Sequence, residues 1–248
     1  MTARRFEILD STRGFAMVWM TVFHFCFDLN NARIIQQDFY HDPFWTWQRT
    51  CILSLFLLCA GAGQAVAHAE GQSWRQFGRR WLHIAAAAGL VSLGSWFMFP
   101  NSYIYFGVLH GMAVMLLLVR LMAPLGAWCA GAGVLVLATH LIAGRALSAG
   151  ASSLFGLDFD ARGLNWLGLI TRLPITEDYV PLFPWLGVML LGFAGMQLLL
   201  KRSGTPPIKR QSSWVRRALA RLGRYSLSYY LLHQPVMLGL LWLAGFGL

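Results

Sequence analysis

The segment 180–200, VPLFPWLGVMLLGFAGMQLLL, contains no charged side chain. A helix needs about 20 mostly apolar residues to cross the hydrocarbon core of a bilayer. The segment therefore predicts a transmembrane helix. The basic residues that begin at Lys201 mark the point where this helix leaves the lipid.

Apolar stretches of this kind recur along the 248 residues, of which 57% are hydrophobic and only 12% charged, whereas soluble domains are about 25% charged. Spans are predicted at 8–29, 45–67, 81–99, 104–122, 126–144, 180–200 and 225–246. The first is not a cleaved signal peptide, because Asp10 and Arg13 interrupt it. The sequence predicts an all-α, polytopic membrane helix bundle of about seven transmembrane helices, forming a single domain over 1–248 without internal repeats.

The orientation follows from Lys and Arg, which gather in cytoplasmic loops. With the N-terminus in the cytoplasm, 14 basic residues fall on the cytoplasmic side and 4 on the outer side. The cytoplasmic set is Arg4, Arg5, Arg75, Arg79, Arg80, Arg120, Lys201, Arg202, Lys209, Arg210, Arg216, Arg217, Arg221 and Arg224. The outer set is Arg33, Arg145, Arg162 and Arg172. This asymmetry predicts a cytoplasmic N-terminus and accounts for most of the formal net charge of +10.

Two loops allow alternative interpretations. The basic segment 201–224 carries no nucleic-acid-binding motif, so no nucleic-acid partner is expected. One interpretation is that the segment contacts anionic lipid headgroups, and the other is that it binds a cytosolic ligand that bears phosphate. The long segment 145–179 on the acidic outer side is either a lid over an outward-facing pocket or a plain connector.

Polar side chains line one face of the first span, at steps of three or four residues. The stripe is Asp10, Arg13, Met17, Thr21, His24 and Asp28. Ionisable groups inside a bilayer face a protein interior or a cavity, so the stripe should face inward with Asp10 paired to Arg13. At ~1.5 Å per residue, His24 lies about 21 Å beyond Asp10, and His110 should share its depth. His233 begins the triplet His233-Gln234-Pro235 in the last span.

These residues leave three functional classes open. An acyltransferase would use a histidine as a base. A transporter or non-catalytic membrane subunit would use the stripe as a solute path. A haem protein would use His24 and His110 as axial ligands. The cysteines Cys26, Cys51, Cys59 and Cys129 form no C-x-x-C pair, so neither a disulfide framework nor a metal site is expected.

Four blocks, in order, carry a resemblance to a known family. They are LDSTRGFA at 9–16 with Met20, His24 and Asp28, then YFGVLH at 105–110, VPLFPWLG at 180–187, and LGRYSL at 222–227 with LHQP at 232–235. Together they resemble bacterial relatives of the heparan-alpha-glucosaminide N-acetyltransferase catalytic domain family. The opening and the ending also resemble, more distantly, the transmembrane acyltransferase superfamily that O-acylates bacterial surface sugars.

The resemblance implies transfer of an acetyl or other acyl group from cytosolic acyl-CoA to an amino sugar or glycan at the outer face. It implies acetyl-CoA as donor, a multi-pass protein of the bacterial inner membrane, and membrane lipid, acyl-CoA and a glycan acceptor as partners; a homodimer stays open. The chain lacks the extra luminal region of the lysosomal enzymes. Their glucosamine acceptor is therefore not carried over.

The predicted roles follow from this chemistry. The base is His24, at the family's polar position in the first span, and the alternative is His41, which corresponds to the catalytic histidine of the lysosomal members. Asp28 belongs to the same catalytic set, and His110 or the Gln234 amide would donate to the oxyanion. The predicted acyl-CoA site is Asp10, Arg13, Arg79, Arg80, Arg224, His233 and Gln234, with the arginines receiving phosphates.

Overall fold

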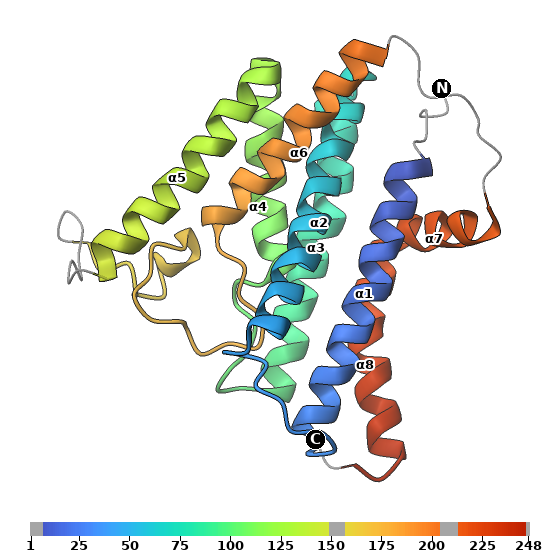
Figure 1. Ribbon diagram of the computed structural model, residues 1–248, viewed down its shortest axis with the longest axis vertical. Coiled ribbons are helices and arrows are strands. Elements are labelled where there is room, and N and C mark those ends of the chain that lie inside the picture. The colour runs from blue at the N-terminus through green and yellow to red at the C-terminus, as the bar shows by residue number, and fades with distance from the viewer. Residues whose placement is uncertain (1–6, 149–156, 204–212, 247–248) are drawn as a thin grey trace. The chain divides into compact units, whose positions relative to one another are not determined.

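The computed structural model describes residues 7–148, 157–203 and 213–246, and these ranges are all-α without a β-strand (Figure 1). The α-helices are α1 (Glu7–Asn31), α2 (Pro43–Ala69), α3 (Trp74–Met98), α4 (Val108–Met122), α5 (Cys129–Ser148), α6 (Leu182–Ser203), α7 (Trp214–Arg224) and α8 (Ser226–Leu243). Short 3-10 helices are η1 (Ala123–Trp128) and η2 (Asn165–Leu167).

The predicted all-α membrane fold is confirmed, because each predicted span coincides with one of the helices α1–α6 or α8. Four described stretches are long and apolar enough to cross a membrane: Pro43–Ala69, Trp74–Met98, Val108–Arg145 and Leu182–Arg202. The third stretch contains α4 and most of α5. Large apolar side chains on these helices are exposed, as lipid-facing residues are: Phe97 is 80% exposed and Trp128 82%.

The chain forms two compact units. The terminal unit is Met1–Cys59 with Pro207–Leu248, and the central unit is Ala60–Pro206. The terminal unit joins the two ends of the sequence: α1 packs against both α7 and α8. A single domain over 1–248 stays a prediction.

The core of the terminal unit forms around one face of α1. Ala16, Met17, Met20 and Phe23 are buried there at helical spacing. Phe39 from the following loop stacks on Trp45 of α2 with a centroid distance of 4.0 Å, and its ring meets Phe23 edge to face. This aromatic packing fixes the loop 32–42 onto the end of α1.

Helix α7 is an element that the spans did not include. Ser213 caps its N-terminus, where the backbone N–H of Arg216 donates to the serine Oγ at 3.3 Å. The helix ends at Arg224, and α8 begins two residues later in a different direction (Figure 1). Figure 1 shows α7 lying crosswise to α1 and α8 near the N-terminal turns of α1.

Candidate functional site

An ion cluster lies where α1 and α7 cross. The Asp10 carboxylate stands between two guanidinium groups: Arg13 Nη1 is 3.6 Å from Oδ1, and Arg224 Nε is 3.5 Å from Oδ2. Arg216 of α7 also pairs with Glu7 of α1 at 3.4 Å. The predicted Asp10–Arg13 pair is present, and the second arginine gives the Asp10 group a surplus positive charge.

Two glycines permit this crossing. A Cβ on Gly14 would lie 1.9 Å from the carbonyl oxygen of Leu219, and one on Gly223 would lie 1.9 Å from that of Asp10. No real side chain tolerates such distances, so α1 and α7 touch backbone to backbone at these positions. This contact brings the Asp10 and Arg224 side chains within reach of each other.

A second polar contact joins α1 and α8 further along the stripe. The hydroxyl groups of Thr21 and Tyr229 lie 2.6 Å apart. The rings of His24 and His233 meet edge to face at 5.3 Å between centroids. The Gln234 amide Nε2 donates to Asp28 Oδ1 at 2.8 Å. The stripe on α1 therefore faces inward, as predicted, against polar residues of α8.

This contact contains three buried acceptors without donors. His233 Nδ1 lies 2.7 Å from the carbonyl oxygen of Tyr230, so Nδ1 carries the proton and Nε2 is an acceptor. Within the described residues, His233 Nε2, Asp28 Oδ2 and Gln234 Oε1 are all buried without a hydrogen-bond partner. Buried polar atoms are normally satisfied. The α1–α8 contact is thus suited to a group that presents N–H or O–H donors.

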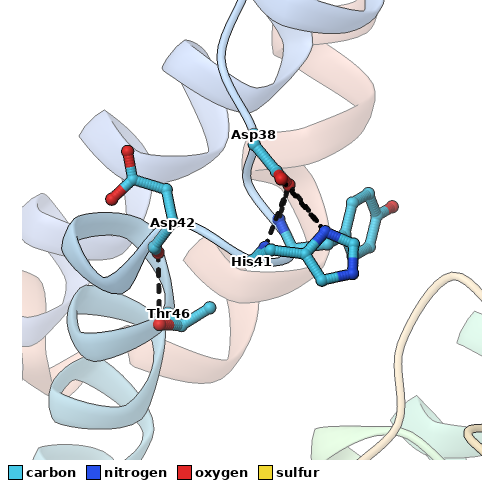
Figure 2. A network of polar contacts seen from close by, with 5 residues as sticks. Asp38, His41, Asp42 and Thr46 are labelled. Atoms are coloured by element: carbon cyan, nitrogen blue, oxygen red, sulfur yellow. Dashed lines mark hydrogen bonds and ion pairs between the residues drawn. The ribbon is translucent and has the colours of Figure 1, made fainter.

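His41 forms a dyad with Asp38 in the loop after α1 (Figure 2). Its Nδ1 lies 3.0 Å from Asp38 Oδ2, and its backbone N–H donates to Asp38 Oδ1 at 2.9 Å. The backbone N–H of His41 and then that of Tyr40 hold the pKa of the Asp38 carboxyl below its ordinary value. Asp38 therefore stays ionised at neutral pH and orients the His41 ring.

Asp38, but not His41, lines an open hollow of about 530 Å³. Polar side chains dominate its lining, which consists of Asn30, Arg33, Ile35, Gln36, Gln37 and Asp38. The hollow is shaped by the loop backbone: Asn30 Oδ1 accepts from the N–H of Gln37 at 2.7 Å, and Arg33 adopts a positive φ of 59°. Amide, guanidinium and carboxylate groups surround a space that hydroxyl-rich molecules could enter.

His110 lies in the central unit, and both of its ring nitrogens have partners there. Nδ1 accepts from the N–H of Gly107 at 3.3 Å, so Nε2 carries the proton and lies 3.0 Å from Ser92 Oγ. Ser92 in turn donates to the carbonyl oxygen of Ile104 at 2.7 Å. His110 thereby ties α3 to the loop before α4. Its equal depth with His24, which lies in the terminal unit, stays a prediction.

The outer loop of the central unit is a hydrogen-bonded structure. Asp160 accepts from the hydroxyl and the backbone N–H of Thr171, and these bonds hold its pKa below the ordinary value. Asn165 Nδ2 donates to Tyr105 Oη at 2.7 Å. Residues 149–156 of the predicted lid lie outside the described residues.

In the same unit, Arg79 and Arg80 on α3 are exposed.

The structure groups most of the predicted site residues in the terminal unit, in three places. Asp10, Arg13 and Arg224 form the α1–α7 cluster; His24, Asp28, His233 and Gln234 form the α1–α8 contact; His41 lies in the loop. His110, Arg79 and Arg80 belong to the central unit.

Several residues of these sites were not predicted to have a role, and Asp38, Tyr229 and Gly223 are the most informative of them. Asp38 could have been found, because an acid three residues before a histidine favours a pair. Tyr229 and Gly223 gave no local signal, since their partners lie more than 200 positions away.

These features define the class: an all-α membrane protein that carries ionisable and amide groups on the facing sides of its helices. The family model for heparan-alpha-glucosaminide N-acetyltransferase, catalytic, matches residues 5–235. The chain belongs to this family, and its family identifies it as a transmembrane acetyltransferase. No curated protein and no solved structure matches the chain.

Proposed function

We propose that the protein transfers an acetyl group from acetyl-CoA on the cytoplasmic side to an amino or hydroxyl group of a sugar or glycan at the outer face of a bacterial inner membrane. One observation carries the proposal. The 25 residues of α1 span about 37 Å, with the Arg13 cluster in the first turns and the Asp38–His41 dyad beyond the last turn. Groups suited to a phosphate-bearing donor and groups suited to a polar acceptor thus lie at opposite ends of one helix, which supports the proposal.

The residues of the terminal unit fit the chemistry of acyl-CoA. Its phosphates suit Arg13 and Arg224, which share only one carboxylate, because guanidinium groups bind phosphate oxygens in a planar fork. Its pantetheine arm bears amide N–H groups, which suit the unpaired acceptors of Asp28, His233 and Gln234. When bound, acyl-CoA supplies a thioester carbonyl that a nucleophile can attack.

Two histidines compete for the role of general base, and geometry favours His41 over His24. Asp38 holds Nδ1 of His41 and leaves Nε2 exposed as the basic atom. His24 packs against the rings of Phe23 and His233 and has no hydrogen bond within the described residues. We assign His41 as the base and His24 as a positioning residue in the α1–α8 contact.

The reaction then balances without a further reactant. His41 Nε2 accepts the proton that the acceptor nitrogen or oxygen loses as it attacks the thioester carbonyl carbon. A C–N or C–O bond forms, the C–S bond breaks, and sulfur leaves with the electron pair as the CoA thiolate. The protonated His41 then returns its proton to water. The hollow beside the dyad supplies hydrogen bonds that orient the acceptor.

The test is acetyl transfer from labelled acetyl-CoA to amino sugars and lipid-linked glycans by purified protein. His41→Ala should lower turnover by about 10² to 10⁴ while acyl-CoA still binds, as expected for a lost general base. Asp38→Asn should lower turnover less, because His41 keeps its basic nitrogen but loses its orienting carboxylate. His83→Ala, at an exposed position on α3, is the matched control and should leave turnover unchanged.

The outcomes separate the two histidines. Near-normal turnover in His41→Ala, together with its loss in folded His24→Ala, would return the role of base to His24. Acetyl transfer to an outside acceptor would be refuted if the wild-type protein cleaved the thioester equally with and without an acceptor. It would also be refuted if the wild-type protein did not cleave the thioester with any acceptor.

A further inference from the structure

Helix α7 buries one face against α1 and leaves the opposite face open. Ala220 and Gly223 are buried at the crossing. Trp214, Arg217 and Arg221 recur at steps of three or four residues, so they share the other face of the helix, and Tyr225 follows at its C-cap. All four are exposed, Trp214 by 75% and Tyr225 by 64%.

The two arginines of this face lack anionic partners. Arg217 and Arg221 make no ion pair within the described residues, because the nearby acids Glu7 and Asp10 pair with other arginines. The neighbouring segments contain no further acidic residues that could pair with these arginines. Segments 1–14 and 207–226 contain nine Lys and Arg residues but only two acidic residues. This excess of exposed positive charge attracts an external anion.

The direction of α7 decides where that anion lies. Figure 1 shows α7 lying crosswise to α1 and α8 at the N-terminal end of α1. With α1 spanning the bilayer, as the sequence predicts, a helix crosswise to it at this end would run along the membrane surface on the side of the N-terminus. Its open face points away from α1. In this orientation the face would lie within the layer of lipid headgroups.

We propose that α7 is an interfacial helix whose open face binds the headgroups of anionic phospholipids. Arg217 and Arg221 pair with lipid phosphates, and Trp214 and Tyr225 lie at the boundary between headgroups and acyl chains, where amphipathic rings are favoured. A soluble phosphate ligand would neutralise the arginines but leave both rings in water. Helix α7 contacts α1 backbone to backbone at Gly14 and Gly223. A lipid that holds α7 in place therefore also stabilises the Arg224–Asp10 pair.

The experiment measures lipid selectivity of the full chain in nanodiscs that contain phosphatidylcholine with a minor fraction of spin-labelled phosphatidylglycerol. The wild-type protein should immobilise phosphatidylglycerol in preference to an equally labelled phosphatidylcholine. The double variant Arg217→Gln with Arg221→Gln should weaken that preference by about thirtyfold, at about 1 kcal/mol for each basic residue near the surface. Replacing both arginines by lysine should retain most of it.

A matched control removes two exposed charges elsewhere. Arg75→Gln with Arg145→Gln removes the same charge at exposed positions outside the basic segment 201–224 and should keep the lipid preference. Equal loss in both double variants would overturn the proposal, because the effect would then be net charge alone. So would a wild-type protein without preference, or an α7 double variant that keeps the lipid but loses affinity for acetyl-CoA. Size-exclusion profiles establish that each variant is folded.

Discussion

The crossing of α1 and α7 is the contact most open to a decisive mutation, and we predict that Gly223→Ala destabilises the protein. Alanine normally improves a helix over glycine by about 0.5–1 kcal/mol. Here its Cβ would lie 1.9 Å from the carbonyl oxygen of Asp10, where contacts under 3.0 Å do not occur. Backbone atoms cannot rotate away, so α7 must move by about 1 Å.

The cost can be worked out from that displacement. Overpacking costs about 1–3 kcal/mol, and a backbone clash belongs at the upper end, so the net loss is about 2 kcal/mol after the gain in helix propensity. For a chain of this size the loss corresponds to a fall in melting temperature of about 4–8 °C. The same movement lengthens the 3.5 Å Arg224–Asp10 contact, so affinity for acyl-CoA should also fall.

Thermal unfolding in detergent measures the first effect, and equilibrium binding of labelled acyl-CoA measures the second. Gly14→Ala should behave in the same way, since its Cβ would meet the Leu219 carbonyl oxygen at 1.9 Å. Gly195→Ala is the control, because nothing lies within 4 Å of a Cβ there. If the melting temperatures of Gly223→Ala and Gly195→Ala are equal and both higher than that of the wild type, the close crossing of α1 and α7 is refuted.

Three further predictions concern topology, the donor site and the outer loop. A reporter fused after Leu248 should lie outside the cytoplasm and one inserted near Gly204 inside; two cytoplasmic reporters would contradict seven spans. Arg13→Ala should weaken acyl-CoA binding more than tenfold in folded protein, since a charge-assisted contact is worth about 1.5–3 kcal/mol, and unchanged affinity would remove Arg13 from the site. Because the Thr171 hydroxyl lowers the pKa of Asp160, the stabilisation of the outer loop is complete above the ordinary value of 3.8 and disappears as the pH falls through the lowered pKa. Hydrogen exchange of residues 157–172 should show this loss, and Asp160→Asn should abolish the pH dependence; equal pH dependence in the variant would contradict the role of Asp160.

The sequence and the structure agree most closely on the spanning helices. Apolar runs long enough for lipid located α2–α6, and the two more polar predicted spans at the ends of the sequence also coincide with helices, α1 and α8. The inward-facing stripe of α1 was also predictable, because helical spacing fixes which of its residues share a face. The crosswise helix α7 was not predictable. Its segment stands out in the sequence mainly by its positive charge, and that charge indicates which side of the membrane the segment lies on, not that it forms a helix.

What the sequence by itself determined is therefore the class of fold and the side chains available for chemistry: regular hydropathy and helical spacing are local properties of the chain. Only the tertiary structure decided their partners. Asp10 meets Arg224, and Asp28 meets Gln234, across more than 200 residues. Contacts of that range depend on backbone approach at Gly14 and Gly223 and on the packing of α1 against α7 and α8, which no local pattern encodes. The dyad of Asp38 and His41 lies between these extremes: its residues are neighbours in sequence, but the aromatic packing of Phe39 on Trp45 holds their loop in place.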